Sequence, residues 1–114
     1  MKWNQLNSLD TLVAIDEASK QKPVVIFKHS TRCSISMMAL SRFERNWKEA
    51  NTEKVSPYYL DLLQYRPISQ AIAKKYHIVH ESPQVLLIKN GVCTFSCTHN
   101  AIDCAELMDQ VGQA

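Results

Sequence analysis

Glycine is scarce in this sequence, with only Gly91 and Gly112 among 114 residues. This scarcity argues against a glycine-rich phosphate-binding loop and against a turn-rich all-β fold. There is no basic tract and the net charge is only +2, so nucleic acid is not an expected partner. No segment approaches the about 18 apolar residues of a membrane-spanning helix, and the first residues lack the apolar run of a signal peptide. We therefore expect no membrane partner and a cytoplasmic location.

The chain does contain enough apolar residues, 46 %, to build a hydrophobic core. Its length is typical of one domain, and we expect residues 1–114 to form a single one. Four cysteines are present: Cys33, Cys93, Cys97 and Cys104. In a reducing compartment this even number does not indicate disulfide bonds, so buried thiols or thiol chemistry are expected instead.

Hydrophobic patterning predicts alternating helices and strands. Four helices are expected, at 8–20, at about 34–50, from Pro67 onward, and after an N-cap at Asn100 or Asp103. Four strands are expected, at 24–27, 58–62, 85–88 and 92–98. Asn90-Gly91 predicts a tight hairpin turn between the last two. The order α-β-α-β-α-β-β-α resembles that of the thioredoxin fold, an α/β fold with a mixed four-stranded sheet flanked by helices.

Cys33 is the candidate reactive residue. It stands where a polar loop, residues 28–32, leads into the second predicted helix, and free backbone N–H groups at a helix start favour an anion. Arg32 precedes it directly, Lys28 and His29 lie in the same loop, and no acidic residue occurs between positions 17 and 44. These features favour the nucleophilic thiolate over the thiol. The alternative is a buried, inert cysteine, a common state of this residue type.

Ser36 lies three residues after Cys33, in the motif Cys33-Ser34-Ile35-Ser36. In a dithiol motif this position holds a second cysteine that closes a disulfide. A serine hydroxyl can donate a hydrogen bond to a thiolate but cannot form that disulfide. The motif therefore predicts monothiol chemistry, in which Cys33 takes a small thiol from a mixed disulfide and a further thiol releases it.

A second motif, Ser82-Pro83, comes directly before the third predicted strand. The thioredoxin fold places a cis-proline at this point beside the thiol, where the preceding residue can pair its backbone with substrate. We expect Pro83 to be cis and Ser82 to contribute to substrate binding, although a trans proline can also begin a strand.

Other residues near the motifs have less specific roles. His29 and His99 could assist proton transfer or merely lie on the surface. Met37 and Met38 are expected to pack in the core, and the alternative is that they form a soft contact surface. Cys93 and Cys97 lie on one predicted strand, so they would be roughly 13 Å apart, too far for one metal ion or one disulfide. We expect no metal site.

Two stretches resemble the YtxJ-like monothiol bacilliredoxins. They are His29-Ser30-Thr31-Arg32-Cys33-Ser34-Ile35-Ser36 and His80-Glu81-Ser82-Pro83-Gln84-Val85, and the likeness extends over nearly the whole chain. It implies a thioredoxin-like fold and a redox role in stress responses, with bacillithiol or glutathione as co-substrate, S-thiolated proteins as partners, and no bound cofactor.

The same resemblance assigns roles to single residues. Cys33 corresponds to the nucleophile and Pro83 to the cis-proline, while Thr31, Arg32 and Ser36 match positions around the thiol. Ser34 stands where the family usually has proline. Two other functions remain open from the sequence: a non-catalytic thioredoxin-fold binding protein, and an iron–sulfur carrier like the monothiol glutaredoxins.

Overall fold

A computed structural model describes residues 1–113 of the chain. The elements follow the order β1 (Asn4–Gln5), α1 (Leu9–Ala18), β2 (Val24–His29), α2 (Ser34–Asn46), α3 (Asn51–Lys54), β3 (Ser56–Asp61), α4 (Arg66–Tyr76), β4 (Gln84–Lys89), β5 (Val92–Thr98), a 3₁₀ turn (His99–Ala101) and α5 (Cys104–Val111). In this described part, no helix is both long and apolar enough to cross a bilayer.

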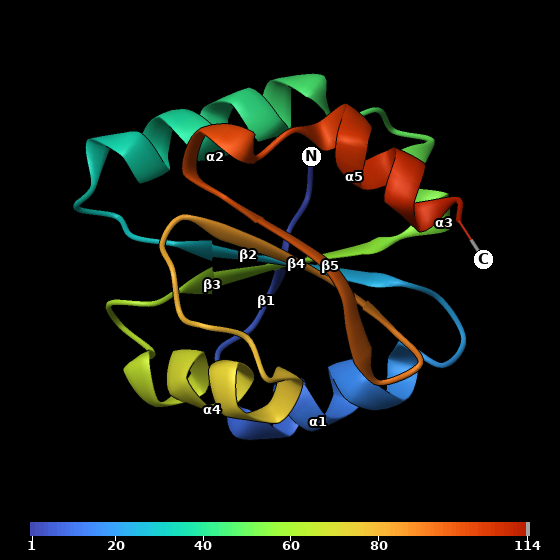
Figure 1. The fold of residues 1–114 in the computed structure, drawn as a ribbon, viewed down its shortest axis with the longest axis horizontal. Coiled ribbons are helices and arrows are strands. Elements are labelled where there is room, and N and C mark those ends of the chain that lie inside the picture. The colour runs from blue at the N-terminus through green and yellow to red at the C-terminus, as the bar shows by residue number, and fades with distance from the viewer. Residues whose placement is uncertain (114) are drawn as a thin grey trace.

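The strands form one mixed sheet in the order β1-β3-β2-β4-β5. Strand β2 runs parallel to β3 and antiparallel to β4, and β5 returns antiparallel to β4. Helices α2, α3 and α5 cover one face of the sheet, and α1 and α4 cover the other (Figure 1). Each face has its own hydrophobic core, to which the central strands β2 and β4 contribute alternate residues. The predicted thioredoxin-like α/β fold is confirmed.

The sheet has five strands where four were predicted. The additional strand, β1, is only two residues long and pairs with Tyr58 and Tyr59 of β3. Both of its residues are polar and exposed, so no hydrophobic pattern marks it. It is held in place by its neighbours, since Leu6 is buried and its N–H donates to the Tyr59 carbonyl at 2.9 Å.

The second helix is shorter than predicted. Helix α2 ends at Asn46, and Trp47 takes an extended conformation. The Trp47 ring is tilted against that of Phe43, with the ring centroids 5.7 Å apart, while its Nε1 donates to Thr52 Oγ1 at 3.1 Å. The side chain that was expected to continue the helix instead closes the core where the chain turns into α3.

The predicted hairpin turn and the predicted starts of the last two helices are confirmed. Asn90 and Gly91 both have positive φ, 51° and 74°, as a two-residue hairpin turn requires. Pro67 lies in the first turn of α4. Of the two candidate caps for the last helix, Asp103 is the N-cap, and its carboxylate accepts the Ala105 N–H at 3.0 Å.

Lys28 and His29 were predicted in a polar loop, but they extend β2 and both are buried. Successive strand residues point to opposite faces. Lys28 therefore lies on the α4 side, where its Nζ contacts His80, and His29 lies on the α2 side, where it contacts Ser36. The apolar run before them ends at Phe27, so the hydrophobic pattern predicted a strand that ends there and not at His29.

Candidate active site around Cys33

Cys33 is the N-cap residue of α2, with extended backbone angles of φ −110° and ψ 120°. Its thiol is half-buried and free. The Cys33 N–H donates to the Ser30 carbonyl at 3.2 Å, and the Cys33 carbonyl accepts the Met37 N–H at 3.0 Å, beginning the helical ladder. No acidic residue lies in the first turn of α2, so the helix start presents its free N–H groups without a competing carboxylate.

Ser36 makes contacts that the sequence did not suggest. It is fully buried, and its Oγ lies 2.7 Å from His29 Nδ1 and accepts the Ser30 N–H at 3.0 Å. Among the described residues, its hydroxyl has no hydrogen bond to the Cys33 thiol. Ser36 therefore joins the end of β2, the loop and the first turn of α2, and so fixes the loop that carries Cys33.

His29 is part of this structural junction rather than a surface group. Its ring lies 5.7 Å from that of Tyr59 and 6.5 Å from that of Phe27. Burial lowers the pKa of His29, although the carboxylates of Asp61 and Glu44 oppose the shift. The ring is therefore neutral at neutral pH and supplies no positive charge to the thiol. Lys28 supplies none either, because its ammonium lies on the opposite face of the sheet.

Removing the Ser36 hydroxyl gives a testable stability prediction. In Ser36→Ala, the buried His29 Nδ1 and Ser30 N–H lose their partner, and an unsatisfied buried polar group costs about 1–3 kcal/mol. We expect the free energy of unfolding, measured by urea denaturation, to fall by that amount. The matched variant Ser34→Ala changes an exposed residue in the same turn and should stay within about 0.5 kcal/mol of the parent protein. Equal stabilities of the two variants would show that the junction contributes nothing.

The residues just before Cys33 are open to solvent. Thr31 and Arg32 are exposed, as is Ser34 after it. Thr31 and Arg32 line a hollow of about 350 Å³ together with Asp61, Leu63, Gln64 and Arg66. Arg32, Lys28 and His29 were expected beside the thiol. Of these three, Arg32 lies at this surface.

Residues 82–83 lie at the same end of the sheet. Lys28 pairs with Gln84 across β2 and β4, so the start of β4 meets the end of β2, from which the Cys33 loop begins. The Ser82–Pro83 peptide bond is cis, and Pro83 is buried. The Pro83 carbonyl accepts the N–H of His99, whose φ is 52°. Ser82 Oγ is buried and has no hydrogen-bond partner among residues 1–113.

Met37 and Met38 were predicted to pack in the core, and that prediction is wrong. They are 55 % and 68 % exposed, because the inward face of this turn is formed by Ser36 and Ala39. Burial raises the pKa of Cys93 and Cys104, and raises that of Cys97 to about 11. They are protonated thiols at neutral pH.

Comparison with known proteins places the chain in a family. Residues 4–107 match the family described as monothiol bacilliredoxin BrxC. The chain belongs to the monothiol bacilliredoxin family. A solved structure described as an oxidoreductase with a thioredoxin fold is 33 % identical, with a TM-score of 0.80 over 96 % of this chain and 92 % of that one. The bacilliredoxin is thus a thiol oxidoreductase.

More distant structures share the fold alone. The thioredoxin of Malassezia sympodialis is 21 % identical, with a TM-score of 0.76 over 96 % of this chain and 88 % of that one. Mitochondrial thioredoxin 3 of Saccharomyces cerevisiae is 16 % identical, with a TM-score of 0.69 over 96 % and 92 %. The bacilliredoxin carries serine rather than a second cysteine at position 36.

Proposed function

We propose that this bacilliredoxin removes a low-molecular-weight thiol, such as bacillithiol, from protein mixed disulfides through Cys33. The observation that carries the proposal is a free, half-buried thiol at the N-cap of α2 with Ser36 in the place of a resolving cysteine. A thiolate there has helix N–H groups and Arg32 nearby, while no second thiol lies in the motif to close a disulfide.

The reaction balances as two thiol–disulfide exchanges. The Cys33 thiolate attacks the small-thiol sulfur of the mixed disulfide, the S–S bond to the client protein breaks, and the client thiolate leaves and takes a proton. Cys33 then holds the small thiol as a new disulfide. A second small-thiol molecule, as thiolate, attacks the sulfur of the first and leaves as an oxidised small-thiol disulfide, which restores the Cys33 thiolate.

Ser82 and Pro83 are proposed to guide the client. Residues beside the start of β4 have backbone groups at the same sheet end as Cys33, and the buried Ser82 Oγ has no partner within the described chain. An extended client segment passing this edge can pair with such backbone groups. Thr31 and Arg32 would face the small thiol on the other side of the loop.

Site-resolved alkylation tests the thiol itself. Iodoacetamide labelling is followed over a pH series, and each cysteine peptide is quantified by mass spectrometry. We expect Cys33 to react near neutral pH, whereas Cys97, whose pKa burial raises to about 11, should react only in strongly alkaline solution. Labelling of Cys33 only at alkaline pH would contradict thiolate activation.

Transfer is tested on the same protein. It is mixed with one client protein carrying either bacillithiol or glutathione, and the mass of the Cys33 peptide is followed with time. We expect the mass of the small thiol to appear on Cys33 as the client thiol is released, with bacillithiol transferred faster. If neither small thiol reaches Cys33, the proposal fails, and a thioredoxin-fold binding protein becomes the better description.

A further inference from the structure

Residues 79–82, which belong to the loop between α4 and β4, make no backbone–backbone hydrogen bond within residues 1–113. Ile78 before them and Pro83 after them each take part in one, at 3.1 Å in both cases. The position of this segment, which includes Ser82, therefore depends on side chains that reach it from other elements.

The side chain of Gln84 holds the segment at two points. Gln84 is 2 % exposed, its Nε2 donates to the Val79 carbonyl at 3.2 Å, and its Oε1 accepts the Glu81 N–H at 3.4 Å. The same Oε1 accepts from Lys28 Nζ at 3.0 Å. Because an ammonium can only donate, Lys28 fixes the Gln84 amide with Oε1 toward itself and Nε2 toward the Val79 carbonyl.

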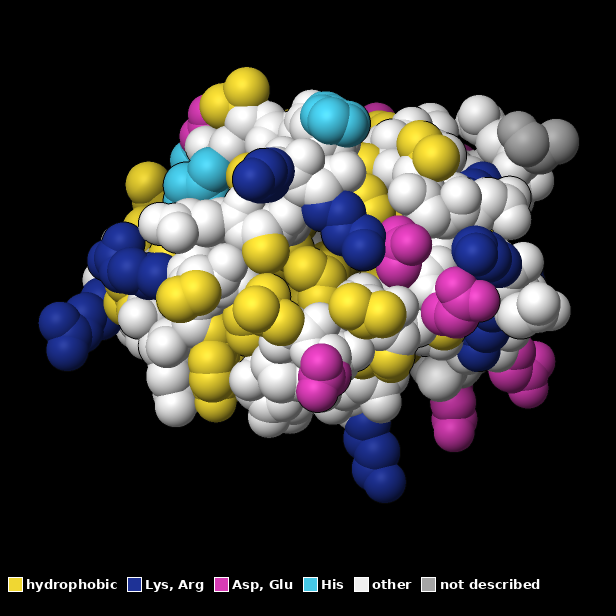
Figure 2. Space-filling model, turned by 90° about the horizontal axis from the view of Figure 1, so that it is seen from below, with side chains coloured by type: hydrophobic (Ala, Val, Ile, Leu, Met, Phe, Trp, Pro, Cys, Tyr) yellow, Lys and Arg dark blue, Asp and Glu magenta, His cyan; other side chains and the backbone are white. Residues whose placement is uncertain are grey.

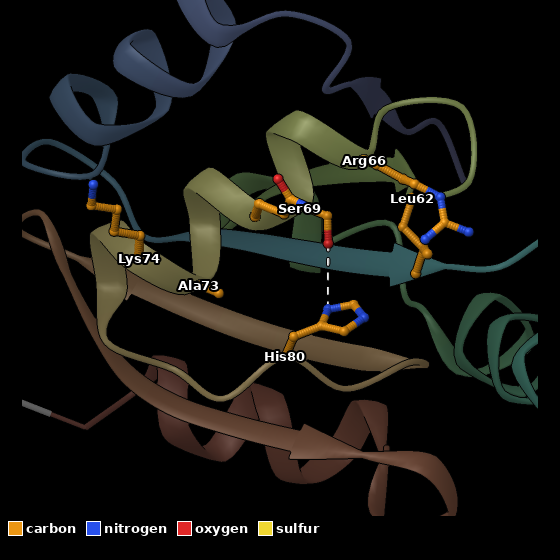
Figure 3. Close-up of a pocket in the computed structure, with 7 residues that line it drawn as sticks. Leu62, Arg66, Ser69, Ala73, Lys74 and His80 are labelled. Carbon is orange, nitrogen blue, oxygen red and sulfur yellow. Dashed lines mark hydrogen bonds between the residues drawn. The ribbon is translucent and has the colours of Figure 1, made fainter.

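Lys28 also contacts the segment directly. Its Nζ lies 2.7 Å from His80 Nδ1, and that nitrogen lies 3.4 Å from Ser69 Oγ, so His80 is held between β2 and α4 (Figure 3). Lys28 is 0 % exposed, so none of the basic side chains visible from the α1 and α4 side belongs to it (Figure 2). Directly or through Gln84, this one buried ammonium is connected to three of the four residues of the segment, 79, 80 and 81.

The Lys28 ammonium has no carboxylate partner among the described residues. Burial lowers its pKa to about 8, opposed by the Glu81 carboxylate, so it is mainly protonated at neutral pH. A buried charge is costly even when it is hydrogen-bonded, and an apolar side chain of similar length would fill the same space without that cost. What the lysine adds here is the direction of its hydrogen bonds.

We propose that Lys28 is a positioning residue for the client protein, because it holds residues 79–82 in place and so sets where the Ser82 backbone lies. This inference rests on the proposed function, in which backbone groups at Ser82 guide the client toward Cys33. The ammonium lies on the opposite face of the sheet from the Ser36 junction that fixes the Cys33 loop. Its loss should therefore affect the docking of the client and leave the thiol unchanged.

Transfer rates from two disulfides test this role. One is a client protein in mixed disulfide with bacillithiol, and the other is bacillithiol disulfide, which contains no polypeptide segment. In Lys28→Met, we expect the second-order rate constant of transfer to Cys33 to fall about tenfold for the client and to stay within about twofold for bacillithiol disulfide, because only the client depends on the segment. Lys54→Met, which removes an exposed lysine of α3, should change neither rate. Equal slowing with both disulfides, or no slowing with either, would overturn the role of Lys28.

Gln84→Leu examines the same path and keeps the test available if Lys28→Met does not fold. Because Lys28 acts largely through Gln84, this variant should slow transfer from the client as Lys28→Met does. The double variant should be no slower than the slower single variant, since the two residues share one path. Slowing that is fully additive in the double variant would show that they act separately and would overturn that path.

A binding measurement separates this inference from the proposed function. Cys33→Ser, which lacks the nucleophile, is titrated with the bacillithiol-modified client, and the backbone amide shifts of Glu81 and Ser82 are followed by NMR. We expect Lys28→Met to raise the dissociation constant about tenfold in this background, because a loosened segment must be ordered on binding. Such weakening without any transfer in the parent protein would reject the proposed function alone. Equal affinities with and without Lys28→Met would overturn the inference even if Cys33 transfers thiols.

Discussion

Replacing Cys33 with serine is expected to reduce removal of the small thiol from a client protein by about a thousandfold or more. The hydroxyl keeps the size and position of the thiol at the N-cap of α2 but is not ionised at neutral pH and cannot form a disulfide. The mixed disulfide of the client should therefore persist, and no small thiol should be found on the variant. The measurement is the release of client thiol with time, monitored by mass spectrometry of the intact client.

The other cysteines provide the control for this experiment. Cys97 is placed best to compete, because it pairs with Val85, two residues beyond Pro83. Burial nevertheless raises its pKa to about 11, so little thiolate is present near neutral pH. Cys97→Ser should transfer the small thiol at the parent rate. If that variant accumulates the small thiol on Cys33 without turning over, Cys97 is a resolving cysteine and the monothiol mechanism is wrong.

The fold was predictable because its signals are local. The apolar runs of β2 and β4, the Asn90-Gly91 turn, Pro67 in the first turn of α4 and the Asp103 cap each act within a few residues of sequence. The thiol position was predictable for the same reason, since Cys33 stands where a buried strand gives way to a helix. The family resemblance agreed with both.

What the sequence did not reveal depends on contacts between distant segments. Strand β1 exists only because β3 lies beside it, and its two residues carry no apolar pattern of their own. Burial of Lys28 depends on His80 and Gln84, which are 52 and 56 positions away. Ser36 was expected to face the thiol, yet the end of β2 brings His29 and the Ser30 N–H within reach of its hydroxyl. Hydrophobic patterning does not predict the burial of polar residues that contact one another.

The aromatic cluster beneath α2 should give the largest loss of stability. Phe43 is 1 % exposed, and its ring lies 5.4 Å from Phe27, 5.8 Å from Trp3 and 5.7 Å from Trp47. These partners come from β2, from the segment before β1 and from the end of α2, so Phe43 holds three parts of the chain together. Truncation of a buried phenylalanine costs about 3–5 kcal/mol, and Phe43→Ala should lower the free energy of unfolding in urea by that amount.

The same variant separates stability from chemistry. Phe43 lies on α2 more than two turns from Cys33, whose own contacts are with Ser30 and Met37. At a temperature where Phe43→Ala is still folded, we expect Cys33 to be alkylated at the parent rate. Phe95→Ala is the matched control for stability. Phe95 is only partly buried on the edge strand β5, so its truncation should lower the free energy of unfolding by less. If Phe43→Ala slows alkylation while the protein remains folded, the position of the thiol depends on packing along the whole of α2 and not on the Ser36 junction alone.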